Sequence, residues 1–158
     1  MERMNPDYIE ETVRTYADML LRSACQQLAS WADAQDVVQE VFLRLMNQPG
    51  FTSGEHLRAW LIRVTVNCCR DVQKSHWRKK REPLSEDWPD GLAESDRFVL
   101  LEIWRLPVQS RNILHLHYVE GYTISEIAKI LDRKENTVAS QLRRARLKLK
   151  DLLQEEEK

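Results

Sequence analysis

Thr123-Ile-Ser-Glu-Ile-Ala-Lys-Ile-Leu131 is followed by Asp132-Arg-Lys134 and by Asn136-Thr-Val-Ala-Ser-Gln-Leu-Arg-Arg-Ala-Arg146. Thr123 and Glu126 have the spacing of a capping box, in which hydroxyl and carboxylate each bind a free amide at a helix start. The apolar residues of the first stretch recur at helical spacing until the Asp-Arg-Lys segment interrupts them. The sequence therefore predicts two short helices joined by a tight turn, an arrangement typical of DNA-reading helix-turn-helix units.

The second helix has one apolar and one polar side when its residues are placed at about 100° intervals. Its inward stripe is apolar: Val138, Leu142, Ala145 and Leu149. Polar side chains suited to a major groove lie opposite this stripe or beside it: Asn136, Thr137, Ser140, Gln141, Arg143 and Arg144. Arginine can pair with guanine, and Asn or Gln with adenine. From Lys129 to Lys150 there are eight basic and two acidic residues, a formal charge of +6, which predicts attraction to phosphate.

A basic helix face by itself is also typical of an ordinary solvated surface. The capped helix that precedes it favours DNA binding over that alternative.

The composition of the whole chain indicates a globular protein with segregated charge. The chain has 158 residues, of which 42% are hydrophobic and only four are glycine, so long helices and a packed core are expected. The formal net charge is −1, yet residues 1–40 contain eight acids and three bases, whereas residues 70–82 contain six bases and two acids. Separate acidic and basic surfaces predict both protein and nucleic-acid partners.

Neither a leader nor a membrane span is expected. The first residues lack a basic segment followed by an apolar run, and no window is long and apolar enough to cross a bilayer. We expect a cytoplasmic protein without direct membrane insertion.

Cysteines and histidines predict no catalytic constellation, metal site or cofactor. Cys25 and the adjacent Cys68-Cys69 form neither a disulfide framework nor a metal-ligand spacing, and are interpreted as small core residues. The four histidines are scattered, and the rings of His115 and His117 should point apart on a helix.

The pattern along the chain predicts an all-α protein of two small helical domains joined by a flexible acidic linker. The expected domains are residues 1–83 and 98–158, with the linker at Leu84 to Arg97. The elements expected in order are helices at Tyr8 to Ala29 and Asp33 to Met46, a loop at Pro49 to Gly54, a helix at Leu57 to Lys80, a helix with Pro107 in its first turn that Gly121 ends, and the helix-turn-helix.

The second predicted helix carries acids beside an outward leucine. Val38, Phe42 and Leu45 should point inward. The outward residues are Asp36, Glu40 and Leu43, with Gln39 beside them. Such a face indicates protein binding, although a solvated face with one stray leucine fits equally well.

The third predicted helix combines aromatic, amide and basic groups. Trp60, Asn67 and Trp77, with the basic run Lys74 to Arg81, are the ingredients of a site for single-stranded DNA. The alternative for Trp60 is a place in the core beside Leu61 and Val64.

Together these residues resemble the extracytoplasmic-function (ECF, group 4) class of bacterial RNA polymerase sigma factors. Asp33 to Leu45 resembles the polymerase-binding helix of that family. Ala59 to Asn67 resembles its promoter-melting segment, and Leu106 to Arg146 is similar to its C-terminal helix-turn-helix.

The resemblance implies a transcription initiation factor that performs no covalent chemistry. Core RNA polymerase would be bound by Asp36, Gln39, Glu40 and Leu43. The minus-10 single strand would be bound by Phe51, His56, Trp60, Asn67, Arg70, Lys74, Trp77, Arg78 and Lys79. The minus-35 duplex would be bound by Asn136, Thr137, Ala139, Ser140, Gln141, Arg143 and Arg144. A membrane-anchored anti-sigma factor is implied as a further partner.

The sequence departs from the family pattern in the DNA-reading unit. Asn136 stands where glycine is frequent, and Ala139 and Gln141 stand where basic residues are frequent. Asp132 replaces the usual glycine of the turn, and Asp tolerates left-handed geometry better than most residues, so the turn should form.

Two other functions fit parts of the pattern. One is a free-standing helix-turn-helix regulator whose first domain senses a ligand or dimerises. The other is a helical protein-interaction bundle that does not bind DNA.

Overall fold

The computed structural model describes residues 5–28, 30–76 and 105–156, and every regular element within these ranges is a helix. The predicted all-α class is therefore confirmed. The chain divides into two compact units between Asp87 and Trp88, and each unit is described by itself. The predicted linker and the predicted start of the second domain at Phe98 lie outside the described residues. None of the described helices is long and apolar enough to cross a membrane.

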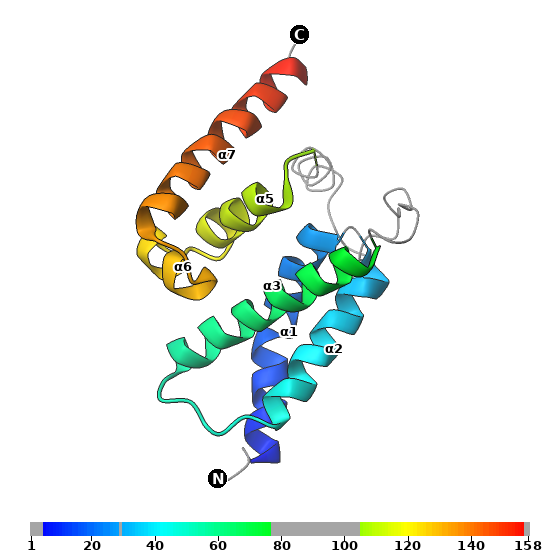
Figure 1. Cartoon of the computed structure of the whole chain (residues 1–158). Coiled ribbons are helices and arrows are strands. Elements are labelled where there is room, and N and C mark those ends of the chain that lie inside the picture. The colour runs from blue at the N-terminus through cyan, green and yellow to red at the C-terminus, as the bar shows by residue number, and fades with distance from the viewer. Residues whose placement is uncertain (1–4, 29, 77–104, 157–158) are drawn as a thin grey trace. The chain divides into compact units, whose positions relative to one another are not determined.

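The first unit contains three helices, α1 (Pro6–Leu28), α2 (Trp31–Met46) and α3 (Gly54–His76), each packed against the other two (Figure 1). The side chains at its centre are almost wholly shielded from solvent: Leu20, Val41, Leu45, Leu61, Ile62, Thr65 and Cys69. Gln73 also donates from Nε2 to the Gln27 carbonyl at 2.8 Å, which ties α3 to the end of α1. Burial of one face of each helix leaves the opposite faces of α2 and α3 exposed.

Side-chain caps place the three helix starts two or three residues before their predicted positions. The Asn5 Oδ1 accepts from the Asp7 amide at 2.9 Å, and the Ser30 hydroxyl accepts from the Asp33 amide at 3.2 Å. The Ser53 hydroxyl accepts from the His56 amide at 3.1 Å. These residues satisfy amide groups that the first helical turn leaves free, so each helix begins directly after its cap.

The cysteines lie in or beside the core of the first unit, as the sequence predicts. All three are free thiols; Cys68 and Cys69 are buried and Cys25 is half-buried. Burial raises the pKa of Cys25 to about 11 and also raises the pKa of Cys69. Because the thiolate is the reactive form, these side chains act as packing groups at neutral pH.

The second unit contains α5 (Val108–Leu114), a π-helix η1 (His115–Val119), α6 (Ile124–Leu131) and α7 (Glu135–Glu156). Its core joins α5 to α7 through Leu106, Ile113, Leu114, Leu142 and Ala145. Arg111 is buried as well and donates to the Leu106 carbonyl at 2.8 Å; burial lowers its pKa to about 10.

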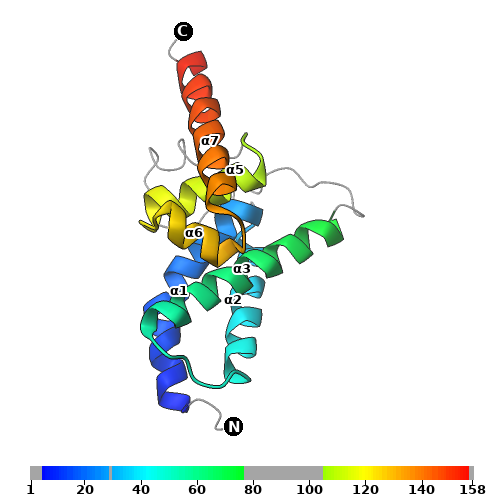
Figure 2. The same cartoon turned by 60° about the vertical axis from the view of Figure 1, so that its left-hand side comes forward.

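The helix-turn-helix forms as predicted (Figure 2). Thr123 Oγ1 accepts from the Glu126 amide and Glu126 Oε1 accepts from the Thr123 amide, both at 3.1 Å, which completes the capping box. Asp132 ends α6 with φ 54° and ψ 54°, the left-handed geometry that the sequence allowed. Within α7, the predicted inward residues Val138, Leu142 and Ala145 are buried and Leu149 is half-buried.

The π-helix differs from the sequence prediction of one continuous helix between Pro107 and Gly121. Pro107 precedes the first helical residue instead of lying in the first turn, and α5 ends at Leu114. The Glu120 amide then donates to the His115 carbonyl at 3.0 Å, a five-residue step typical of π geometry. A widened turn of five residues is too short to alter the apolar periodicity, so the pattern does not reveal it.

We expect Thr123→Ala to lower the stability of the second unit by about 1 kcal/mol, because it removes one half of the capping box. Ser125→Ala, inside the same helix turn, should have a smaller effect. Amide hydrogen exchange of peptides from α6 and α7 measures both changes. Equal protection in the Thr123→Ala and wild-type proteins would contradict the prediction.

We expect all three thiols to resist iodoacetamide at neutral pH in the folded protein and to react after unfolding in urea. A thiol with a higher pKa in the folded state holds its proton more tightly there. The raised pKa of Cys25 therefore stabilises the folded state fully below pH 9.0, and this stabilisation is lost as the pH rises toward about 11. Mass spectrometry follows the labelling, and rapid native alkylation of Cys69 would overturn the assignment.

Candidate nucleic-acid and protein interfaces

The outward face of α2 presents the four residues that the sequence singled out. Asp36, Gln39, Glu40 and Leu43 are all exposed, and Leu43 is 57% exposed despite being apolar. The predicted inward residues Val38 and Leu45 are buried and Phe42 is half-buried. The result is an apolar centre bordered by carboxylates.

Met46 and Arg44 extend this face beyond the predicted residues. Met46 lies one turn after Leu43 and is 48% exposed, so two apolar side chains stand side by side in solvent. Arg44 donates from Nε to Glu40 Oε1 at 3.0 Å, and this hydrogen bond raises the pKa of Arg44. The i, i+3 spacing of Leu43 and Met46 was the signal in the sequence that could have revealed the second apolar side chain.

An aromatic cluster forms where the loop before α3 folds back on that helix. The Phe51 ring lies 5.1 Å from the His56 ring in an edge-on arrangement and 5.6 Å from the Trp60 ring. Thr52 Oγ1 and His56 Nδ1 are 3.2 Å apart. Trp60 is half-buried, so it belongs partly to the core and partly to this cluster.

Polar and basic side chains continue from the aromatic cluster along the exposed side of α3. Asn67, Arg70 and Lys74 are exposed and recur at three- and four-residue steps, which places them on one face. Arg63, which the sequence reading did not include, is exposed on the same face. The predicted residues Trp77, Arg78 and Lys79 lie outside the described part of the chain.

The N-terminal half of α7 presents most of the predicted DNA-reading residues to solvent. The exposed ones are Asn136, Thr137, Ala139, Ser140, Arg143 and Arg144. Gln141 is half-buried, and its Oε1 accepts a hydrogen bond from Arg133 NH1 at 3.0 Å. The guanidinium of Arg144 stays close to its own helix, with Nε 3.4 Å from the Ser140 carbonyl.

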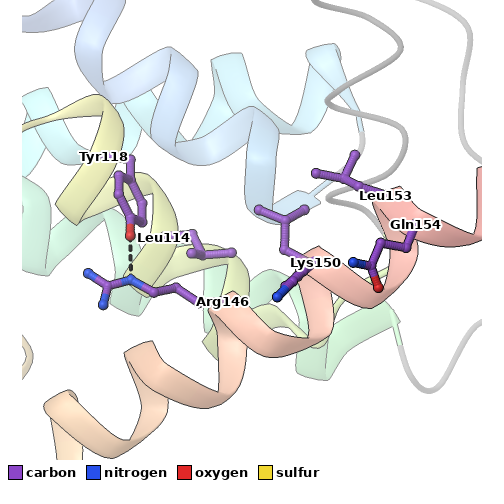
Figure 3. A pocket seen from close by; sticks show the side chains of 7 residues that line it. Leu114, Tyr118, Arg146, Lys150, Leu153 and Gln154 are labelled. Atoms are coloured by element: carbon purple, nitrogen blue, oxygen red, sulfur yellow. Dashed lines mark hydrogen bonds between the residues drawn. The ribbon is translucent and has the colours of Figure 1, made fainter. Parts of the chain in front are cut away.

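Arg146 contributes to the basic charge of this region, but its contacts lie away from the predicted DNA-reading residues. Its guanidinium carbon lies 5.4 Å from the centre of the Tyr118 ring, and its Nε donates to the Tyr118 hydroxyl (Figure 3). Both side chains line a shallow hollow with Leu114, Leu149, Lys150, Leu153 and Gln154. The positive charge of Arg146 is therefore directed toward η1.

The histidines of η1 turn to different partners. His117 Nδ1 is 2.8 Å from the Tyr122 carbonyl, whereas His115 Nε2 faces Glu120 Oε1 at 3.2 Å. Across the described residues, no three His, Cys, Asp or Glu side chains gather as metal ligands would.

Both units match models of known protein families. Residues 12–82 match the family described as Sigma-70 region 2, and residues 99–149 match Sigma-70, region 4. The chain is also 30% identical to the ECF RNA polymerase sigma factor SigM of Mycobacterium tuberculosis, over 96% of this chain and 86% of that protein.

The chain belongs to the ECF family of RNA polymerase sigma factors. It is thus a transcription initiation factor of a non-enzymatic family. The RNA polymerase sigma-E factor of Streptomyces avermitilis is 31% identical to this sigma factor, with 92% of this chain and 84% of that protein aligned. The ECF sigma factor SigE of Mycolicibacterium smegmatis is 30% identical, and the alignment spans 91% of this chain but 61% of the relative.

Solved structures of sigma factors share the fold. CnrH, solved in complex with the cytosolic domain of CnrY, has a TM-score of 0.69 and 25% identity to this sigma factor, covering 95% of this chain and 90% of CnrH. RpoE of Bartonella quintana, solved with the anti-sigma factor NepR, has a TM-score of 0.81 and 20% identity, covering 95% of this chain and 98% of RpoE. The latter similarity shows the fold.

We expect Arg146→Ala to leave promoter affinity almost unchanged while lowering the stability of the second unit by about 0.5–1 kcal/mol, the range of an exposed cation–π contact. Arg143→Ala, which removes an outward guanidinium from the same helix, should weaken binding of polymerase holoenzyme to promoter DNA about tenfold or more. Fluorescence anisotropy and hydrogen exchange measure the two effects. Equal losses of DNA affinity in the two variants would contradict the orientation of Arg146.

Proposed function

We propose that this sigma factor attaches to core RNA polymerase through α2, reads the minus-35 element through α7 and captures a minus-10 base at the start of α3. The observation that carries the proposal is the outward face of α2, where Leu43 and Met46 are exposed and follow Asp36 and Glu40 along the helix. The surfaces of α3 and α7 would then contact the promoter as parts of the holoenzyme.

The α2 face has the composition of a protein interface. An apolar centre bordered by charge can bury its hydrophobic groups against a partner while the acids at the rim select a basic one. Glu40 pairs with Arg44 at 3.0 Å on the exposed surface, a weak interaction that a basic partner can replace. A basic, partly apolar surface of core polymerase is the expected complement.

The start of α3 offers the contacts that a flipped base needs. Extruding a base from duplex costs a few kcal/mol, which stacking and hydrogen bonding must offset. The rings of Phe51, His56 and Trp60 supply stacking surface, and Asn67 supplies an amide. Arg70 and Lys74 lie further along the same face, where they would neutralise the phosphates of the strand. Trp77, Arg78 and Lys79 would continue this contact.

The exposed side of α7 suits duplex DNA. Asn136, Ser140 and Arg143 project from the side opposite the buried stripe, so they would face base edges when the helix lies in the major groove. Thr137, Ala139, Gln141 and Arg144 border them and would contact the sugar-phosphate backbone or the groove wall.

A free-standing regulator is the second function that the sequence left open. Family membership favours the sigma factor, and so does the α2 face, which a regulator that binds duplex by itself does not require. The same reasoning applies to a protein-interaction bundle, which would not require the exposed polar face of α7.

An anti-sigma factor is the expected inhibitor. The similarity to CnrH, which was solved with the cytosolic domain of CnrY, supports a partner whose cytosolic domain makes the contact. We propose that this partner is anchored in the membrane and covers the polymerase and DNA faces.

The α2 face is tested by Glu40→Lys and Leu43→Ala in core-polymerase pull-down and run-off transcription. Glu40→Lys reverses a rim charge and should abolish measurable binding, and Leu43→Ala should weaken it about tenfold, the effect of losing an apolar anchor. Glu11→Lys makes the same charge change on exposed α1 and should bind and transcribe like the wild type.

Three results would contradict the proposal in different ways. Wild-type affinity in both α2 variants would mean that core polymerase binds elsewhere. Equal loss in Glu11→Lys would mean that net charge, and not the α2 face, governs binding. Specific duplex binding without core polymerase would favour the free-standing regulator.

A further inference from the structure

We propose that Arg133 and Gln141 form a phosphate-binding pair beside the recognition helix, in which Arg133 positions the Gln141 amide to donate to a DNA phosphate. This inference rests on the proposed function, because it assumes that α7 enters the major groove of the minus-35 duplex. It narrows the role of Gln141 from a contact with the backbone or the groove wall to a phosphate contact, and it gives Arg133 a role in promoter binding.

The backbone of the turn fixes the position of Arg133. Asp132 takes the left-handed conformation, and the Arg133 amide then donates to the Ala128 carbonyl at 2.9 Å. From this anchored position the side chain of Arg133 crosses to the second turn of α7 and meets Gln141 Oε1 at 3.0 Å. The contact spans eight residues of sequence, so it joins the turn to the recognition helix.

The chemistry of the two groups determines how the Gln141 amide is oriented. A guanidinium has only donors, so the amide must present its oxygen to Arg133 and direct its Nε2 group away. Within the described part of the chain, this Nε2 group makes no hydrogen bond. Donation from a cation to the amide oxygen also polarises the amide, which strengthens its N–H groups as donors.

The position of Gln141 on α7 favours a phosphate over a base. Gln141 borders the buried stripe of Val138, Leu142 and Ala145, on the side of the turn, and is half-buried itself. Residues at the centre of the exposed side face base edges, whereas those at the margin of a recognition helix meet the sugar-phosphate backbone. A donor amide beside a guanidinium at this margin suits an anion.

A phosphate contact and a base contact predict different binding data. Loss of a phosphate contact weakens binding evenly across DNA sequences, and loss of a cation near the backbone lowers the slope of log affinity against log salt by about 1. Loss of a base contact instead relaxes the preference at one base pair. These two signatures can be measured in one experiment.

The experiment uses holoenzyme assembled from core polymerase and the full chain, titrated onto promoter fragments in which each minus-35 base pair is substituted in turn, at several salt concentrations. We expect Arg133→Ala and Gln141→Ala each to weaken binding about tenfold on every fragment, the usual effect of a hydrogen bond to a charged group. The double variant should lose no more than either single variant, since both act through one contact.

Three further variants separate positioning from charge and from folding. Arg133→Lys keeps the cation and should keep the wild-type salt slope while recovering only part of the affinity, because the planar fork is absent. Gln141→Glu keeps an acceptor for Arg133 but has no amide donor, and should bind more weakly than Gln141→Ala while folding normally. Lys150→Ala removes a charge from the hollow beside Tyr118 and should behave like the wild type.

Each remaining outcome overturns the inference. A changed preference at one base pair with an unchanged salt slope would make Gln141 a base reader. Wild-type promoter affinity in folded Arg133→Ala and Gln141→Ala proteins would mean that the hydrogen bond between Arg133 and Gln141 joins the turn to α7 but does not contribute to DNA binding. If wild-type holoenzyme shows no minus-35 preference at all, the proposed role of α7 fails and the inference fails with it.

Discussion

The reversal of the chain at Asp132 is the constraint on which the second unit depends. Asp132, in the left-handed conformation, ends α6 and turns the chain so that α7 packs against α6. The apolar side of α7 then completes the core that α5 and α6 share. Side chains on opposite sides of a helix cannot both face the same core. Burial of Val138, Leu142 and Ala145 therefore determines which residues of α7 remain in solvent. The polar face of α7 is therefore a consequence of packing as much as of its own composition.

The first unit follows the same logic with three helices. Each helix contacts the other two, so only one side of α2 and one side of α3 stays uncovered. Acids and two apolar side chains occupy the free side of α2, whereas amide and basic groups occupy that of α3. The unit thus presents two chemically different surfaces from one core, which suits partners of different charge.

Local signals in the sequence predicted most of the fold and only part of the candidate sites. The capping box of Thr123, the inward stripe of α7 and the outward residues of α2 depend on spacing within one helix, so periodicity was sufficient. The π-helix that begins at His115 differs from an α-helix in its backbone hydrogen-bond partners, and the apolar periodicity does not reveal this difference. The contacts of Arg133 with Gln141 and of Arg146 with Tyr118 join separate elements through long side chains, so they could be found only in three dimensions.

The loop that packs Phe51 against His56 and Trp60 has a consequence for the order of events at a promoter. The ring contacts of this loop and the Ser53 cap are made within the chain itself, so they restrict the loop when the protein folds. If a base is captured there, as we propose, it would meet a surface that these contacts already order. The proposed capture would then require opening of the DNA and little rearrangement of this loop.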